Sequence, residues 1–248
     1  MPPKAKQEEV KKVILGRASN TLRMGLVGLP NVGKSTTFNF LSNLSVPAEN
    51  FPFCTIDPNL AKIFVPDQRF ERLCEMYKPK SKVPATINIT DIAGLVRGAS
   101  EGAGLGNAFL SHIAAVDGIY HVVRAFENAE IIHEEGEVEP CRDMDIIYGE
   151  LIAKDLQFLK VKIDEVDKII KRTNTKPARD EMEVLMKVDS LFKALKCVKD
   201  GEWSARDIEF LNTYQFLTAK PVVYLVNISR DDFIKKKNKW LPKINAWI

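Results

Sequence analysis

The sequence predicts an α/β fold, in which a mostly parallel sheet is flanked by helices, and three observations support this prediction. An apolar run, Leu22–Val27, leads into a glycine-rich loop that opens onto a helix. Residues Thr86–Thr90 alternate between polar and apolar types, as a half-buried strand does, and Leu60–Val65 suggests a further strand. Two further apolar runs, Asp117–Phe126 and Val222–Val226, are typical of buried strands in a parallel sheet.

Length and composition limit the class of protein. The chain has 248 residues, enough for one sizeable core, and its net charge of +3 is too small to indicate nucleic-acid binding or direct reading of DNA. Its four cysteines form no C-x-x-C pair, which argues against a zinc site and fits a reducing compartment. The polar N-terminus and the lack of a long apolar window predict a cytoplasmic protein with no membrane partner and a mobile leader at residues 1–20.

Residues Gly25–Thr36 contain the spacing G-x-x-x-x-G-K-S/T, formed by Gly28, Gly33, Lys34 and Ser35. Glycines allow the loop to fold back so that its N–H groups converge on an oligophosphate, and the following helix adds the positive end of its dipole. Lys34 is expected to lie between the terminal phosphates, and the Ser35 hydroxyl is expected to ligate Mg²⁺. An ordinary surface turn is the alternative, but the flanking strand and helix favour a nucleotide-binding site.

A D-x-x-G motif follows the alternating strand at Asp91 and Gly94. Asp91 can hold the Mg²⁺ shell through water, and the Gly94 N–H can sense the terminal phosphate. The next residue is Leu95, where Ras-type enzymes have a glutamine that orients the attacking water. Leucine has neither donor nor acceptor, so the catalytic group must come from elsewhere or hydrolysis must be slow.

Two further side chains are candidates for contact with the phosphates. Thr55 lies in the proline-rich segment Phe51–Asn59, where it is either a switch threonine that contacts Mg²⁺ or a turn residue without that role. His112 follows a glycine-rich stretch and is either able to swing toward the phosphates or a satisfied helix histidine.

A change of periodicity after about residue 140 predicts an inserted antiparallel helical hairpin at about 140–200. Its two heptad seams are separated by the polar segment Lys171–Asp180 and comprise Ile152, Leu156, Leu159, Ile163, Val166 and Ile170, then Val184, Val188, Leu191, Leu195 and Val198. Two amphipathic helices lying on the sheet are the alternative. The hairpin is charged on its outer faces and could serve as an arm for a large partner.

Two helices are predicted near the C-terminal end. Ser204 and Asp207 form a capping-box pattern that starts a helix leading toward Pro221. The tail, Phe233–Ile248, is interpreted as a basic helix whose lysines form a solvated face.

The segment Asn227–Arg230 stands where GTPases have N-K-x-D. In that motif the aspartate accepts two hydrogen bonds from guanine, whereas Arg230 is only a donor. Adenine has no 2-amino group and needs no such acceptor, so ATP is favoured over GTP. A shifted loop that brings Asp231 or Asp232 into place would restore guanine recognition.

Taken together, the motifs GLPNVGKST, FPFCTIDPN, DIAGLVRGAS, GLGNAFLSHI and KKKNKWLPKI resemble those of the Obg-like ATPase (YchF) family, within the Obg branch of P-loop GTPases. The resemblance covers nearly all of residues 15–248. It implies a Ras-like P-loop NTPase domain interrupted by a helical arm, with ATP preferred over GTP and a link to ribosomes and translational control.

The resemblance also implies roles for individual residues. Phosphate would be bound by Asn31, Val32, Gly33, Lys34, Ser35 and Thr36, and adenine by Phe126, Asn227 and Ile228. Mg²⁺ would be held by Ser35 and Thr55, with Asp91 from the D-x-x-G motif. His112 matches a histidine proposed to replace the missing glutamine, and Asn31 matches an asparagine that holds K⁺ in potassium-stimulated relatives.

The chain departs from the family pattern in two ways. Arg230 stands where members usually have glutamate, and no small-residue base-binding loop, last sheet strand or C-terminal TGS domain follows Ile248. We therefore expect residues 21–248 to form an OBG-type G domain truncated at its C-terminal end, with an exposed sheet edge.

These observations predict a slow, Mg²⁺-dependent nucleoside-triphosphatase that works as an ATP-preferring switch. Water positioned by His112 would attack, while Lys34, Mg²⁺ and loop N–H groups such as that of Gly94 stabilise the developing charge. Two alternatives remain open. One is an Obg-type GTPase in ribosome assembly, and the other is a nucleotide-gated interaction module in which hydrolysis is incidental.

Overall fold

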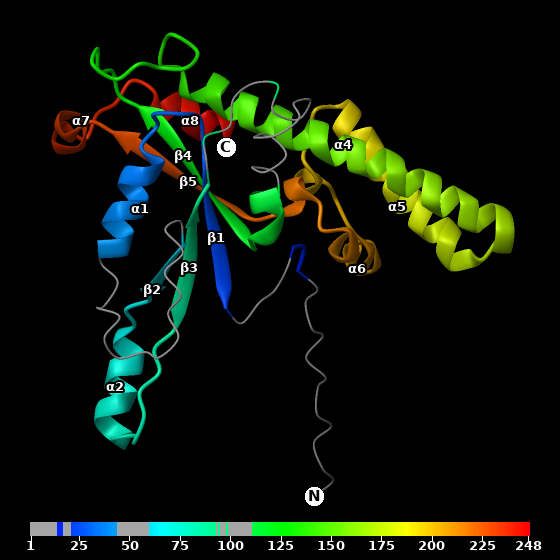
Figure 1. Ribbon diagram of the computed structural model, residues 1–248, viewed down its shortest axis with the longest axis horizontal. Coiled ribbons are helices and arrows are strands. Elements are labelled where there is room, and N and C mark those ends of the chain that lie inside the picture. The colour runs from blue at the N-terminus through cyan, green and yellow to red at the C-terminus, as the bar shows by residue number, and fades with distance from the viewer. Residues whose placement is uncertain (1–13, 17–20, 44–59, 93, 95–97, 99–110) are drawn as a thin grey trace, which may run out of the picture.

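A five-stranded sheet with the order β2-β3-β1-β4-β5 lies at the centre of the structure (Figure 1). The structure is a computed structural model that describes residues 14–16, 21–43, 60–92, 94, 98 and 111–248. Its strands are β1 (Leu22–Val27), β2 (Leu60–Phe64), β3 (Thr86–Asp91), β4 (Gly118–Ala125) and β5 (Val222–Ile228). Each of them lies where the apolar or alternating runs of the sequence predict a strand.

Strand direction confirms the predicted mostly parallel sheet. β1 pairs in parallel with β3 and with β4, and β4 pairs in parallel with β5. Only the pairing of β2 with β3 is antiparallel among these strands. The carboxyl ends of β1, β3, β4 and β5 therefore meet at one edge of the sheet, where ligands bind in open α/β sheets.

Helices flank this sheet and extend beyond it (Figure 1). They are α1 (Lys34–Asn43), α2 (Gln68–Tyr77), α4 (Pro140–Thr173), α5 (Lys176–Lys193), α6 (Ala205–Tyr214), α7 (Arg230–Lys235) and α8 (Leu241–Trp247). Residues 111–115 are also helical, and Val198–Asp200 and Leu217–Ala219 form 3₁₀ turns. None of the described helices is both long and apolar enough to cross a membrane.

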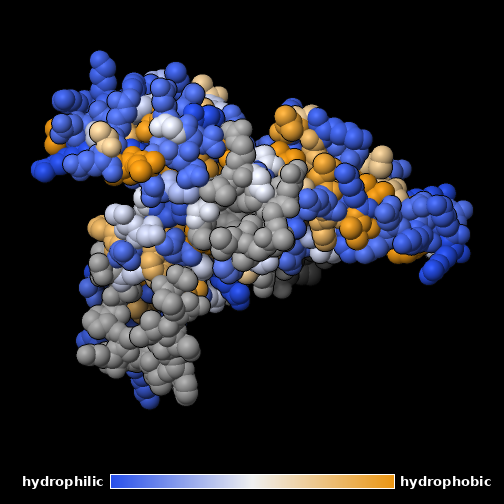
Figure 2. All heavy atoms as spheres, turned by 45° about the horizontal axis from the view of Figure 1, so that its top comes forward, coloured by the Kyte–Doolittle hydropathy of each residue, from blue (hydrophilic) through white to orange (hydrophobic). Residues whose placement is uncertain are grey.

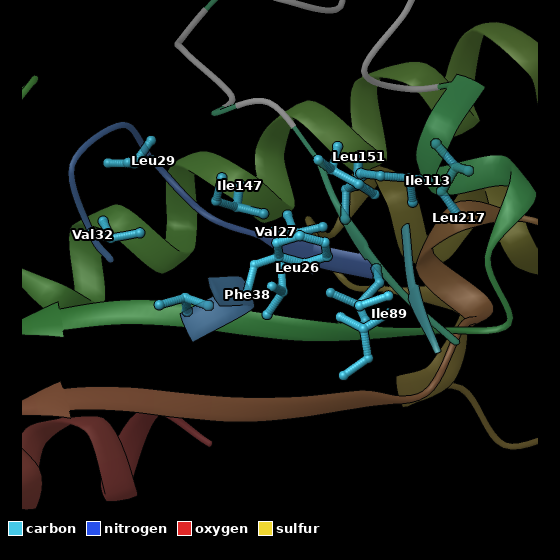
Figure 3. Packing of buried hydrophobic residues seen from close by; sticks show 14 of the residues in the cluster. Leu26, Val27, Leu29, Val32, Phe38, Ile89, Ile113, Ile147, Leu151 and Leu217 are labelled. Carbon is cyan, nitrogen blue, oxygen red and sulfur yellow. The ribbon is translucent and has the colours of Figure 1, made fainter. Parts of the chain in front are cut away.

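Helix α4 belongs to two cores. Ile147 and Leu151, near its start, pack over Leu26 and Val27 of β1 in the sheet core (Figure 3). Further along, α4 packs against α5 in a second core, and the two helices run side by side away from the sheet as an arm (Figure 1). All six residues of the first predicted seam contribute to this second core: Ile152, Leu156, Leu159, Ile163, Val166 and Ile170. The helical arm is therefore present, while the start of α4 lies on the sheet, as the alternative expected.

The second seam and the break between the helices differ from the prediction. Only residues 174–175 separate α4 from α5, because Asn174 adopts a left-handed conformation (φ 44°) that ends α4, and a proline in the first turn of α5 favours the start of the next helix. Leu195 is 79% exposed, since α5 ends before this position is reached. Leu185 and Phe192 fill the core instead.

Two helix predictions near the C-terminal end are also corrected. Ser204 caps α6 in a capping box as predicted, but the helix ends at Tyr214 rather than continuing toward Pro221, because Gln215 is left-handed. The tail is two short helices rather than one. Left-handed Lys236 ends α7, and Asn238 then donates hydrogen bonds to the Ala125 carbonyl and to Asp232, which holds the intervening segment against the end of β4.

Burial predicts which leucine stabilises the arm. Leu185→Ala should lower the free energy of unfolding by about 2–5 kcal/mol, because it removes a fully buried side chain and leaves a cavity. Leu195→Ala, at an exposed position, should change it by about 0.5 kcal/mol or less. Urea denaturation of both variants measures the difference, and equal losses would contradict the assignment of the second seam.

Candidate functional site

Close packing at the edge of the sheet determines the shape of the loop between β1 and α1. A Cβ atom at Gly28 would lie 2.5 Å from the Val122 carbonyl oxygen, so only glycine allows this approach. Gly33 has a φ of +105°, and a Cβ there would lie 2.5 Å from Nδ2 of Asn227. The predicted strand, loop and helix are thus confirmed. Each of the two motif glycines is required by a different close contact, with Val122 at Gly28 and with Asn227 at Gly33.

Lys34 begins α1 and is folded back onto this loop. Its ammonium donates hydrogen bonds to the carbonyl oxygens of Gly28 at 3.1 Å and Leu29 at 2.7 Å, and the residue is only 8% exposed. Burial lowers the pKa of Lys34 to about 8, and the nearby Asp91 carboxylate opposes this shift. The side chain is therefore charged at neutral pH and titrates just above it.

The D-x-x-G motif contacts the start of α1 through a hydrogen bond between Asp91 and Ser35. The Ser35 hydroxyl donates to Oδ2 of Asp91 at 2.9 Å, and a Cβ at Gly94 would lie 3.1 Å from Nζ of Lys34. Hydroxyl and carboxylate oxygens suit Mg²⁺, which commonly takes one or two carboxylates together with substrate phosphates. No group of three or more His, Cys, Asp or Glu side chains suitable for a metal occurs within the described part of the chain. Ser35 and Asp91 thus fit an ion that is shared with phosphate oxygens.

A cavity of about 410 Å³ lies at this edge of the sheet, and it is lined by Asn31, Gly33, Lys34, Ser35, Thr36, Phe126, Ile131 and Asn227. All of these residues except Ile131 were predicted from the sequence as site residues. Asn227 also donates from Nδ2 to the Val32 carbonyl oxygen at 3.0 Å, which ties β5 to the phosphate loop. Residues from three segments of the chain therefore form one site.

Other predicted site residues lie elsewhere. The Val32 side chain is 1% exposed and belongs to the sheet core, so only its backbone can face a ligand. Ile228 packs against the cluster that contains Val123, Ala125, Met144 and Ile244, and is not among the described residues that line the cavity. His112 is an exposed residue in the helical segment 111–115 and is likewise absent from this lining. Thr55 lies outside the described residues.

Two residues of the loop that follows β4, Ile131 and Ile132, were not predicted from the sequence as part of the site. Ile131 lines the cavity, and the next residue, Ile132, accepts a hydrogen bond from Nδ2 of Asn31 at 3.1 Å through its carbonyl oxygen. Arg124, a charged residue inside a mostly apolar strand, was an available signal, because a buried arginine requires partners nearby.

Cavity size alone would not find this site. A larger cavity of about 690 Å³ lies beside Tyr148, Tyr224 and Trp247, but no phosphate-binding loop contributes to its described lining. The loop glycines, Lys34 and the hydrogen-bonded pair of Ser35 and Asp91 identify the smaller cavity as the candidate phosphate-binding site.

The sequence model of the 50S ribosome-binding GTPase family matches residues 23–228, which include the loop, the D-x-x-G motif and Asn227. This chain belongs to that family. Obg-like ATPase 1 of Oryza sativa subsp. indica is 57% identical over 251 residues, covering 100% of this chain and 64% of that protein. The Homo sapiens protein of the same description is 52% identical and is covered to 63%.

A solved structure agrees with these matches. The Schizosaccharomyces pombe YchF GTPase superposes with a TM-score of 0.81 at 51% identity, over 96% of this chain and 64% of that chain. The resemblance to the Obg-like ATPases drawn from the motifs is confirmed, as is the P-loop GTPase fold. This chain spans 63 to 64% of the length of these relatives.

The pKa of Lys34 predicts how nucleotide affinity depends on pH. Phosphate oxygens stabilise the ammonium, so binding raises a pKa that is about 8 in the free protein, and affinity should be greatest below that value. Above it, affinity for Mg²⁺-nucleotide should fall by about tenfold per pH unit, because one proton is taken up on binding. Calorimetric titration from pH 7 to 9.5 tests this, with Lys34→Met as the control that should show weak binding without this slope. A flat profile for the unmodified chain would contradict the prediction.

Proposed function

We propose that this chain is a Mg²⁺-dependent nucleoside-triphosphatase that prefers ATP over GTP and acts as a nucleotide switch. The observation that carries the proposal is that Lys34 and Ser35, which line the cavity, are joined by the D-x-x-G motif: Asp91 accepts the hydrogen bond of Ser35, and Gly94 lies beside the Lys34 ammonium. These residues supply the charge, the hydroxyl, the carboxylate and the N–H group that P-loop hydrolases use around a terminal phosphate.

In the proposed mechanism, loop N–H groups and the start of α1 bind the phosphates, and Lys34 exchanges its two carbonyl partners for phosphate oxygens. Ser35 and Asp91, with Thr55 as a further ligand, would hold Mg²⁺, which when bound neutralises charge on the phosphate oxygens. The Gly94 N–H faces the terminal phosphate. His112 orients the attacking water in place of the glutamine that Leu95 replaces.

The base preference is supported by the residues that follow β5. Arg230 is exposed at the start of α7 and can only donate hydrogen bonds. Asp232, one possible guanine acceptor, already accepts from Nδ2 of Asn238 at 2.8 Å, and its backbone N–H caps α7 through the Ser229 hydroxyl. Phe126, which lines the cavity, offers a ring on which adenine would stack.

Two further parts of the proposal concern K⁺ and the ribosome. Asn31 uses its amide nitrogen to bond the Ile132 carbonyl, so its amide oxygen is the atom that would ligate K⁺ beside the phosphates.

Figure 2 shows hydrophilic residues over the outer end of the arm, which is suited to contact with a large hydrated partner. The family description and the resemblance favour the ribosome as that partner, in the cytoplasm.

One observation favours a second function, a nucleotide-gated interaction module. Helix α4 runs without interruption from the sheet core beside the site into the arm, so a partner on the arm is mechanically joined to the nucleotide site. In that case a hydrolysis-dead variant would retain partner binding and cellular function.

Base selectivity can be tested through Arg230. Competition calorimetry should show tighter binding of Mg²⁺-ATP than of Mg²⁺-GTP, and Arg230→Asp should improve GTP affinity by about tenfold, the scale of one charge-assisted hydrogen bond. Arg230→Ala is the matched control, since it removes the donor without adding an acceptor. Tighter GTP binding by the unmodified chain would instead support an Obg-type GTPase.

His112 can be tested by turnover. His112→Ala should lower kcat by about 100-fold or more while leaving ATP affinity unchanged, because general-base or water-orienting groups act on the chemical step. His112→Gln, which restores an amide capable of orienting water, should retain part of the activity. Full turnover by His112→Ala would rule out this role.

A further inference from the structure

Arg124 is a charged residue in the interior of the protein. It lies near the end of β4, is 1% exposed, and is among the largest fully buried side chains of the described residues. Burial lowers its pKa, and the nearby Asp143 carboxylate opposes that shift and favours the charged form. A buried guanidinium is stable only if its N–H groups find acceptors.

Those acceptors all belong to the loop that follows β4. Nε donates to the Phe126 carbonyl oxygen at 3.1 Å, Nη1 to that of Ile131 at 3.2 Å, and Nη2 to that of Asn128 at 3.3 Å. The guanidinium carbon also lies 4.8 Å from the centre of the Phe126 ring. A single planar group therefore fixes three carbonyl groups and one aromatic ring, which the point charge of lysine cannot do.

The loop held in this way forms one wall of the cavity. Phe126 and Ile131 line it directly, and the Ile132 carbonyl accepts a hydrogen bond from Asn31 of the phosphate loop. Arg124 is also the cross-strand partner of Asn227, which lines the same cavity from β5. The guanidinium lies behind this wall, and Arg124 itself is not among the described lining residues.

The far end of the loop has an anchor of its own. Nε2 of His133 bonds Oδ2 of Asp143 on α4 at 2.9 Å, and Nδ1 accepts from the Glu135 backbone N–H at 3.2 Å. Since Nδ1 is an acceptor, the proton is on Nε2 and the imidazole is the donor to Asp143. Loss of Arg124 would therefore free the middle of the loop while leaving its connection to α4 in place.

We propose that Arg124 is a positioning residue for the nucleotide base: it holds Phe126 and Ile131 in the conformation that binds the base, and takes no part in holding the phosphates. This inference rests on the proposed nucleotide-binding function and assigns separate parts of the cavity to base and phosphate. It predicts that the two contributions to affinity can be separated by one substitution.

The test compares Mg²⁺-ATP with Mg²⁺-tripolyphosphate, which has no base, by calorimetry. Arg124→Met and Arg124→Lys should both weaken ATP binding by about tenfold or more, the scale of one lost base–aromatic contact. Tripolyphosphate affinity should change by less than about twofold, because Asn227 supports the phosphate loop through the Val32 carbonyl oxygen, in a hydrogen bond in which Arg124 has no part. Lys34→Met should weaken both ligands.

Controls separate this role from a loss of stability. Leu185→Ala, which weakens the arm core away from the cavity, should bind both ligands as the unmodified chain does, and circular dichroism should show that each variant is folded at the titration temperature. Equal loss of both ligands in the Arg124 variants, or no loss of ATP, would overturn the positioning role while leaving the proposed function intact. Failure of the unmodified chain to bind Mg²⁺-ATP would overturn both.

Discussion

The parallel register of β1, β3, β4 and β5 is the constraint on which the candidate site depends. Because these strands run in the same direction, the segments that follow them begin at one edge of the sheet. The site is therefore assembled from residues far apart in the chain, such as Asn227 and Val32, which lie 195 positions apart and share a hydrogen bond. Any change in strand order would separate the phosphate loop from the segments that complete the cavity.

Buried polar groups hold the loops at this edge in place. Lys34 and Arg124 are both buried, and each donates to backbone carbonyl oxygens of a neighbouring loop. Asp155 on α4 follows the same rule: burial raises its pKa to about 6, and donors from Leu217 and Thr218 oppose the shift. Burying a charged or polar group is costly unless it has hydrogen-bond partners. Each of these groups therefore favours the one arrangement of the surrounding chain that supplies those partners.

Helix α4 connects the site to the arm as a single element of 34 residues, about 50 Å long at the usual rise of an α-helix. Its first turns pack on the sheet and bond His133 of the loop beside the cavity, whereas its later turns belong to the second core, which they share with α5. The direction of the arm is consequently set at the sheet. This arrangement explains why both alternatives considered for the helices, a hairpin and a pair lying on the sheet, were partly right.

The sequence by itself determined the strands, the phosphate loop with its D-x-x-G partner, and the first seam of the arm, because each depends on spacing between near neighbours in the chain. Helix α2, the antiparallel pairing of β2, the exposure of Leu195 and the division of the tail were not predictable in this way. The sequence named most residues of the cavity wall, but it missed Ile131 and gave no means of separating Asn227 from Ile228. Only the tertiary structure decided which of them face one another, and it alone explained Arg124. The physical reason is that burial and hydrogen-bond partners are supplied by distant segments, whose positions a local pattern does not contain.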